Sequence, residues 1–243
     1  MLRAQLAKEW RLLLTPGFGL ALSFCWLALG WYLLAGLEEY NAIAGQLAQL
    51  ENRRGATEMY LGAANQWLQT LMVLWSIYFG ARSLAQERQW QTQTLHYGSD
   101  WTPFLWAKAL VLGTCLLLLT LPFWLVVLWL QSGVHWDGLL LAAQALGQLF
   151  FLLFALGLSL SISATQSQAL SASLLTALAW LLLWLAPTLS TSPAWLPPLL
   201  RYLSPFEHFQ LLQQGIVALQ TGAYLLFMLF IFGLATAYCW PDR

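Results

Sequence analysis

Long runs of apolar residues alternate with short polar segments along this chain. Residues 12–37, 59–81 and 109–134 contain no charged side chain, and neither does the longer stretch 138–200. A helix that spans a bilayer needs roughly 20 such residues. The polar tract Ser159–Gln168 divides the long stretch in two, and a last apolar run follows Gly222. The pattern therefore predicts an all-α membrane protein, a single domain over 1–243, with six spans at about 16–37, 60–82, 104–131, 139–163, 168–189 and 222–240.

The first residues have a helical pattern of their own. Residues 1–14 place four apolar side chains on one face, which favours a helix lying on the inner membrane surface: Leu2, Leu6, Trp10 and Leu13. Glu9 falls close to this apolar stripe and disturbs it. The alternative is a solvated basic tail that only fixes the topology.

Two other segments outside the spans are informative. Residues 83–102 begin as a polar continuation of the second span and form an inner loop large enough to present a surface to a cytoplasmic protein. The sequence from Ser204 through Pro205 to Glu207 has the pattern of a capping box, with proline at the first helical position. It predicts a short, half-buried outer helix over 205–214 that ends at Gly215.

Composition and charge agree with a membrane protein. The chain is 60% hydrophobic and only 8% charged, whereas a soluble domain has about a quarter charged residues. Its net charge is zero, so no basic excess suggests a nucleic-acid partner. If the N-terminus is cytoplasmic, most basic residues lie on the inner side, which satisfies the positive-inside rule and makes both termini cytoplasmic: Arg3, Lys8, Arg11, Arg82, Arg88, Lys108 and Arg243.

Several kinds of chemistry lack their residues. No ionisable side chain sits in the centre of a predicted span, which argues against proton-coupled transport. Ser159 fits the GxSx pattern of intramembrane serine proteases, but His96, His135 and His208 lie in loops or at a helix end, away from any serine in a span. The sequence indicates no metal site and no resident cofactor. It also lacks a GxxxxGK[ST] phosphate loop, so any ATP and Mg must be bound by another subunit.

The polar residues inside the predicted spans are hydroxyls and amides. Such groups form hydrogen bonds between helices, and small residues spaced by four allow helices to approach closely. The alternative is that they line a substrate pathway or a dimer interface. The sequence leaves both interpretations open for the same set: Gln66, Gln69, Thr70, Ser76, Gln144, Gln148, Ser159, Ser163 and Ser171.

The layout and three motifs are similar to a known family. The motifs are Glu87–Leu95 followed by Lys108, the outer segment from Ser204 to Phe209 with Gly215, and the short turn that ends at Gln168. Together with the order of spans and surface helices, they resemble the permease subunit of type-2 ABC exporters. The chain looks most like the gliding-motility-type and nitrous-oxide-reductase-maturation-type permeases.

The resemblance implies a half-transporter in the bacterial cytoplasmic (inner) membrane, surrounded by lipid. Two permeases, identical or paralogous, would pair above two cytoplasmic ABC ATPase subunits that bind ATP and Mg and hydrolyse ATP. The expected ATPase contacts are Glu87, Arg88, Trp90, Thr92 and Leu95, and the expected outer-helix residues are Ser204, Glu207 and Phe209. A non-transport membrane scaffold that holds a cytoplasmic protein is the alternative, and an intramembrane serine hydrolase is the third hypothesis.

Overall fold

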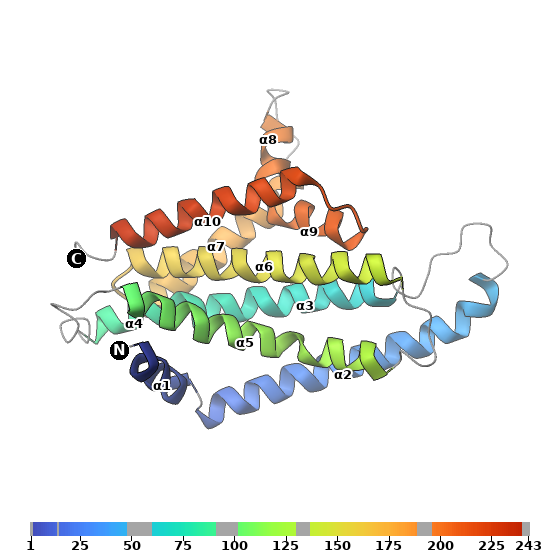
Figure 1. Ribbon diagram of the computed structural model, residues 1–243, viewed down its shortest axis with the longest axis horizontal. Helices are drawn as coiled ribbons and strands as arrows, with labels where there is room; N and C mark the ends of the chain where they lie inside the picture. The colour runs from blue at the N-terminus through green and yellow to red at the C-terminus, as the bar shows by residue number, and fades with distance from the viewer. Residues whose placement is uncertain are drawn as a thin grey trace.

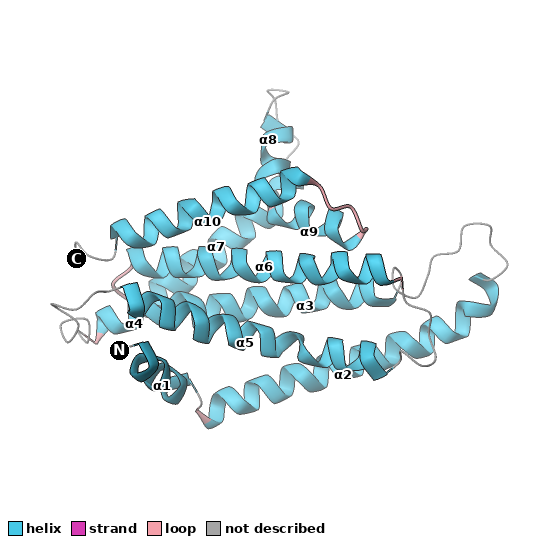
Figure 2. Ribbon diagram, viewed as in Figure 1, coloured by secondary structure: helices cyan, strands magenta, loops and turns pink. Residues whose placement is uncertain are grey.

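The computed structural model describes residues 2–13, 15–47, 60–90, 102–129, 137–188 and 196–239. Within these ranges all regular structure is helical, which confirms the predicted fold class (Figures 1 and 2). The helices are α1 (Leu2–Leu13), α2 (Pro16–Leu47), α3 (Gly62–Trp75), the π-helix η2 (Ser76–Gly80), α4 (Ala81–Gln89), α5 (Thr102–Trp129), α6 (Gly138–Thr165), α7 (Ala169–Leu185), the 3-10 turn η5 (Ala186–Thr188), α8 (Leu196–Leu203), α9 (Pro205–Gln213) and α10 (Leu219–Cys239).

Five helical stretches in the described ranges are long and apolar enough to cross a bilayer. They correspond to five of the six predicted spans: Pro16–Ala42, Pro103–Trp129, Gly138–Thr165, Ala169–Thr188 and Leu219–Cys239. Between these stretches, α1, α8 and α9 are too short to span. The chain is therefore a multi-pass membrane protein by helix length and composition.

The second predicted span has a different form from the other five. Its α-helix, α3, has only 14 residues and is followed directly by the five residues of η2 and then by α4. The span predicted over about 60–82 is thus a composite element, which stays helical to Gln89 as the predicted polar continuation requires. Figure 1 shows α4 continuing the line of α3 beside α6. The structure does not establish this element as a sixth span.

The π-helix η2 lies where this composite element meets α6 and α7. The Ser76 hydroxyl donates to the Val73 carbonyl at 2.8 Å and accepts a bond from the Trp180 indole N–H of α7 at 3.0 Å. One turn on, Gly80 lies directly against Ser159 of α6. A π-helix places its residues out of step with the α-helical repeat. In this chain, both Ser76 and Gly80 of η2 are buried against these neighbouring helices.

Helix α6 is the centre of the bundle. It packs against α3, α4, α5, α7, α9 and α10, and Figure 1 shows it running between α10 and α5. Small residues of α6 allow neighbouring helices to pack closely. Gly147 contacts Leu212 of α9, and Gly157 contacts Phe232 of α10. The predicted close packing at Ser159 is also present, since Gly80 lies against it.

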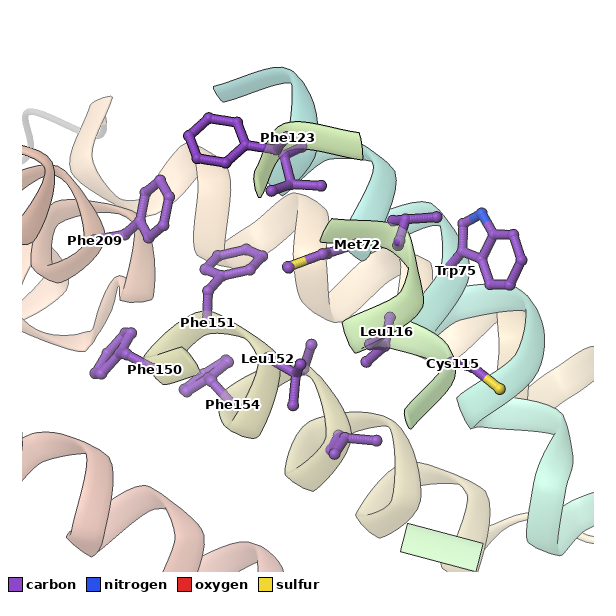
Figure 3. Close-up of a cluster of buried hydrophobic side chains, with 14 of the residues drawn as sticks. Met72, Trp75, Cys115, Leu116, Phe123, Phe150, Phe151, Leu152, Phe154 and Phe209 are labelled. Atoms are coloured by element: carbon purple, nitrogen blue, oxygen red, sulfur yellow. The ribbon is translucent and has the colours of Figure 1, made fainter. Parts of the chain in front are cut away.

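Aromatic side chains fill the core between α6, α7 and α9 (Figure 3). Phe151 of α6 lies with its ring centroid 5.2 Å from that of Trp180 and 5.4 Å from that of Phe209. Phe154, one turn nearer the α6 C-terminus, packs edge-on against Phe232 at 5.3 Å. Phe209, predicted as an outer-helix residue, is therefore part of the core.

Helix α9 matches its predicted range, but its N-terminus differs from the capping-box prediction. Pro205 occupies the first turn as expected, whereas the Ser204 side chain makes no cap bond. Its hydroxyl donates instead to the Leu183 carbonyl of α7 at 3.1 Å, and Glu207 faces Arg201. At the other end Gly215, with φ of +80°, closes a Schellman motif in which Ile216 N–H donates to the Leu211 carbonyl at 2.9 Å.

Helix α8 was not expected from the sequence. Pro197 and Pro198 lie in its first turn, where a helix tolerates proline. Figure 1 shows α8 projecting from the bundle at a large angle to the spans.

Large apolar side chains cover the outer surfaces of the long helices. On α2 the exposed set recurs along one face: Leu20, Phe24, Leu27, Trp31 and Leu34. Similar faces occur on α7 and α10. Exposed apolar surface of this extent requires lipid or another protein to cover it.

The contact between Gly80 and Ser159 gives a test of this packing. A Cβ at position 80 would lie 2.7 Å from the Ser159 Cβ, closer than real Cβ atoms approach. We expect Gly80→Ala to lower the free energy of unfolding by about 1–3 kcal/mol, as overpacked cores do. Thermal unfolding of the purified protein in detergent measures the change.

Two further variants make this test specific. Gly30→Ala on α2, where an added Cβ would meet nothing within 4 Å, should not destabilise the protein. Adding Ser159→Gly to Gly80→Ala should recover part of the loss. Equal effects of Gly80→Ala and Gly30→Ala would contradict the packing described here.

Candidate functional site at the end of α4

Four charged side chains from three helices meet at the end of the bundle where both chain termini lie (Figure 1). The Lys108 ammonium of α5 lies 3.0 Å from Glu9 Oε2 of α1 and 3.2 Å from Glu87 Oε1 of α4. Lys8 Nζ lies 3.8 Å from the same Glu87 oxygen. We call these four residues the ionic cluster. Its two cations and two anions balance, so it has no net charge.

The cluster is shielded from solvent in the single chain. The Lys108 residue is only 4% exposed, and Glu9 and Glu87 are also buried. The Lys108 ammonium also lies 5.0 Å from the centre of the Phe104 ring, one turn earlier on α5. A buried charge is tolerated only when it is paired, because desolvation costs several kcal/mol per ion. The position of each of these three helices therefore depends on the other two.

Helix α1 is oriented by the same contacts. Leu6 and Trp10 pack against the core as the predicted apolar stripe requires, while Lys8 and Arg11 are exposed. Glu9, which disturbed the stripe in the sequence, is buried because Lys108 neutralises it. The helix thus rests on α5, and the stripe prediction is confirmed for Leu6 and Trp10.

The residue after Glu87 binds two other helices. Arg88 donates to the Cys239 carbonyl, the last residue of α10, at 2.7 Å, and to the Gln166 carbonyl just after α6 at 3.4 Å. Carbonyl groups at helix C-termini have no partner within the helix and favour a positive charge. Arg88 satisfies both of these ends at once and is itself buried.

The next polar contacts complete the junction. Gln89 accepts a bond from the Ala169 N–H at the start of α7, at 3.3 Å. Ser163 of α6 accepts from the N–H groups of Leu84 and Ala85, at 3.0 and 2.9 Å. Three consecutive residues, Glu87, Arg88 and Gln89, thus tie α4 to α1, α5, α6, α7 and α10. We call these three residues the α4 junction.

The structure places two of the five expected ATPase contacts inside the chain. Glu87 and Arg88 were predicted as contacts of a cytoplasmic partner, but both are buried and bind other parts of this chain. Trp90, directly after the junction, is 60% exposed. Thr92 and Leu95 lie outside the described residues.

Sequence reasoning missed the pairing of Glu9, Glu87 and Lys108. The available signals were an acidic residue next to an apolar stripe and a lysine beside a long apolar run. Neither signal predicts which residue forms the ion pair, because Lys108 lies 99 residues from Glu9 in the chain.

A second polar network lies deeper between the helices. Gln148 of α6 donates its amide N–H to Asn65 Oδ1 of α3 at 2.5 Å and accepts from the Trp124 indole N–H of α5 at 2.9 Å. Asn65 and Gln148 are both buried. Gln148 therefore links three helices, and Asn65 and Trp124 are members that the sequence did not single out.

The residues predicted to line a pathway or to join helices fall into two groups. The buried group is Ser76, Gln144, Gln148, Ser159 and Ser163. Ser76, Gln148 and Ser163 form hydrogen bonds with neighbouring helices, which fits the role of joining helices, whereas the Ser159 hydroxyl donates within α6. Gln66 and Thr70 are exposed on α3, whereas Gln69 and Ser171 are partly buried.

The serine and histidine considered for hydrolysis lie in unrelated surroundings. Ser159 donates to the Ala155 carbonyl at 2.7 Å and faces Gly80. His208 is in helix α9 rather than in a loop; its ring nitrogens lie within hydrogen-bond distance of Tyr202 O and Thr221 Oγ1. His96 and His135 lie outside the described residues.

Comparisons with known proteins give no indication of the function. A scan against protein-family models finds no match, and a search of curated proteins finds no relative. Among the residues that the structure describes, no group of three or more His, Cys, Asp or Glu side chains is placed to hold a metal ion.

Breaking the ionic cluster on one side should destabilise the chain. Lys108→Met leaves the buried carboxylates of Glu9 and Glu87 without their nearest cation, and we expect a loss of about 3–5 kcal/mol in the free energy of unfolding. Denaturant unfolding in detergent micelles measures it.

The control is Lys8→Met, because Lys8 is 44% exposed and more distant from Glu87. It should have little effect. The combination Glu9→Gln, Glu87→Gln and Lys108→Met leaves only the exposed Lys8 charged and should recover most of the stability. Similar losses for Lys8→Met and Lys108→Met would show that the cluster does not hold the helices together.

The deeper network gives a second prediction. Gln148→Leu removes the partner of both Asn65 and the Trp124 indole, and a buried polar group without its partner costs about 1–3 kcal/mol. We expect a lower unfolding temperature. Gln66→Leu on the exposed face of α3 should leave it unchanged. An unaltered unfolding temperature for Gln148→Leu, together with altered function, would indicate a pathway residue instead.

Proposed function

We propose that this chain is the membrane-spanning permease subunit of an ATP-driven ABC exporter, coupled to separate cytoplasmic ATPase subunits. The apolar spans and the absence of a phosphate loop from the sequence support a separate subunit that binds ATP and supplies the energy. The observation on which the proposal rests is the α4 junction, which ties α4 to helices throughout the bundle and leaves Trp90 exposed beyond it.

The junction supplies a physical route from a cytoplasmic partner to the spans. A force on the segment after Gln89 would act on α4, whose charged end cannot move without exposing or separating buried ions. Because Arg88 binds the ends of α6 and α10, and Gln89 binds the start of α7, these helices would move with α4. ATP and Mg would be held by the partner ATPase, whose closure supplies the force.

Pairing with a second permease agrees with the surface of α3. Gln66 and Thr70 expose polar groups there. Lipid tails cannot hydrogen-bond such groups, whereas a second helix can. We place the substrate pathway at this interface, because the buried polar side chains of a single chain are largely used to join its own helices.

We assign the roles of the expected ATPase contacts from the exposure of Trp90 and the burial of Glu87 and Arg88. Trp90, and beyond the described residues Thr92 and Leu95, form the surface that docks on the ATPase. Glu87 and Arg88 position that surface rather than contact the partner. In a scaffold that only holds a cytoplasmic protein, the same surface would bind without any dependence on nucleotide.

The test is purification of the complex from its native membrane. An ATPase should copurify, and Trp90→Ala should lower its permease-stimulated hydrolysis by roughly tenfold while insertion and thermal stability stay normal, as loss of an exposed aromatic anchor does at interfaces. Trp129→Ala, which removes a similarly exposed tryptophan at the C-terminus of α5, is the matched control. Copurification of a partner without ATPase activity would favour the scaffold, and full function with no partner would refute the proposal.

A further inference from the structure

A cavity of about 450 Å³ is lined by residues of α8, α9 and the start of α10. Figure 1 shows this part of the protein away from the two chain termini. Its size is that of pockets that bind small molecules. Its wall includes both charged and polar side chains: Arg201, Tyr202, Glu207, His208 and Gln220. The ionic cluster and the α4 junction contribute no residue to it.

Two opposite charges lie next to each other in the wall of this cavity. Arg201 Nε of α8 lies 3.8 Å from Glu207 Oε1 of α9, and their side chains are 64% and 41% exposed. An exposed pair at this distance contributes little to stability, because water and salt screen it. Both side chains are long and can rotate toward a ligand without disturbing the core.

The wall beneath this pair is rigid. Because the Tyr202 carbonyl can only accept, His208 Nε2 carries the hydrogen of their 3.0 Å bond. Nδ1 then accepts from the Thr221 hydroxyl at 3.3 Å, and the imidazole stacks on Tyr224 with ring centroids 4.2 Å apart. His208 is thus fully used in holding α9 against α10, so it shapes the cavity and leaves recognition to the charged pair.

Exposed apolar side chains lie close in the sequence to the residues that line the cavity. Leu199 and Leu203 of α8 are exposed, and the connection from α9 into α10 exposes Ile216, Val217 and Leu219. Since α8 is also strongly two-sided, with Arg201 in its last turn, it fits a helix lying at a membrane surface. The cavity therefore opens where the polar part of an amphiphile would meet its apolar part.

We infer that this cavity binds a zwitterionic headgroup in which an ammonium group lies close to a phosphate. The Arg201 guanidinium matches the oxygens of a phosphate, and the Glu207 carboxylate binds the ammonium. A simple anion would bind Arg201 but leave Glu207 unpaired and repelled, whereas a zwitterion replaces both partners of the existing ion pair. The inference does not depend on the proposed exporter function, since it concerns binding alone.

The ligand can come from two sources with the same chemistry, an intact phosphatidylethanolamine or free phosphoethanolamine. Native mass spectrometry of the full chain, exchanged into micelles that contain phosphatidylethanolamine or phosphatidylglycerol, separates headgroups by retained mass. We expect one phosphatidylethanolamine to be retained at least tenfold more than phosphatidylglycerol. Displacement by millimolar phosphoethanolamine would assign the free molecule as a ligand too, and lack of displacement would assign the lipid.

Variants make the site assignment specific. Arg201→Gln and Glu207→Gln should each reduce retention at least tenfold, and so should the charge exchange Arg201→Glu with Glu207→Arg, which keeps an ion pair but reverses it. Glu39→Gln, an exposed carboxylate on α2, is the matched control and should not change retention. Unfolding temperatures equal to that of the wild type establish that the variants are folded. Unchanged retention in these cavity variants, or equal retention of both lipids by the wild type, would overturn the inference.

Discussion

The Lys108 ammonium lies between two carboxylates, one from α1 and one from α4, in a place that solvent scarcely reaches. In such surroundings an ion that loses its counter-ion pays the full desolvation penalty, so the three helices are held in one arrangement. Because α3 continues through η2 into α4, Glu87 lies at this position. Arg88 then forms hydrogen bonds with the ends of α6 and α10, and Gln89 with the start of α7. A short polar extension is thereby joined to most of the bundle.

Elsewhere in the bundle, single polar side chains also join two or three helices. Gln148 joins three helices, Ser76 joins η2 to α7, and Ser163 joins α6 to α4. Hydroxyl and amide bonds of this kind contribute modestly one at a time, but they set which helix faces meet. The outer surfaces, by contrast, are mainly apolar and leave Gln66 and Thr70 exposed on α3. The apolar outer surfaces need lipid or another protein to cover them. In the proposed exporter, the energy would come from a partner ATPase.

Local signals in the sequence were sufficient for much of the fold. Apolar runs located five spans, Thr15 caps α2 through the Phe18 N–H, and Gly215 ends α9 with a positive φ. What the sequence did not reveal depends on contacts between distant segments. Ser204 bonds to α7 instead of capping α9, and Glu87 and Arg88 are buried because Glu9, Lys108 and the ends of α6 and α10 meet them. The π-helix likewise contacts Trp180 and Ser159, and no local pattern in the sequence predicts these contacts.

The central claim is that Lys108 locks α1 and the end of α4 into one unit. Spin labels at Ala7 of α1 and at position 90, both exposed, report this directly by pulsed electron resonance in nanodiscs, after Cys25, Cys115 and Cys239 are replaced by serine. The account predicts one narrow distance distribution for the chain with Lys108 and a clearly broader one for Lys108→Met. Identical narrow distributions in the two proteins would contradict it.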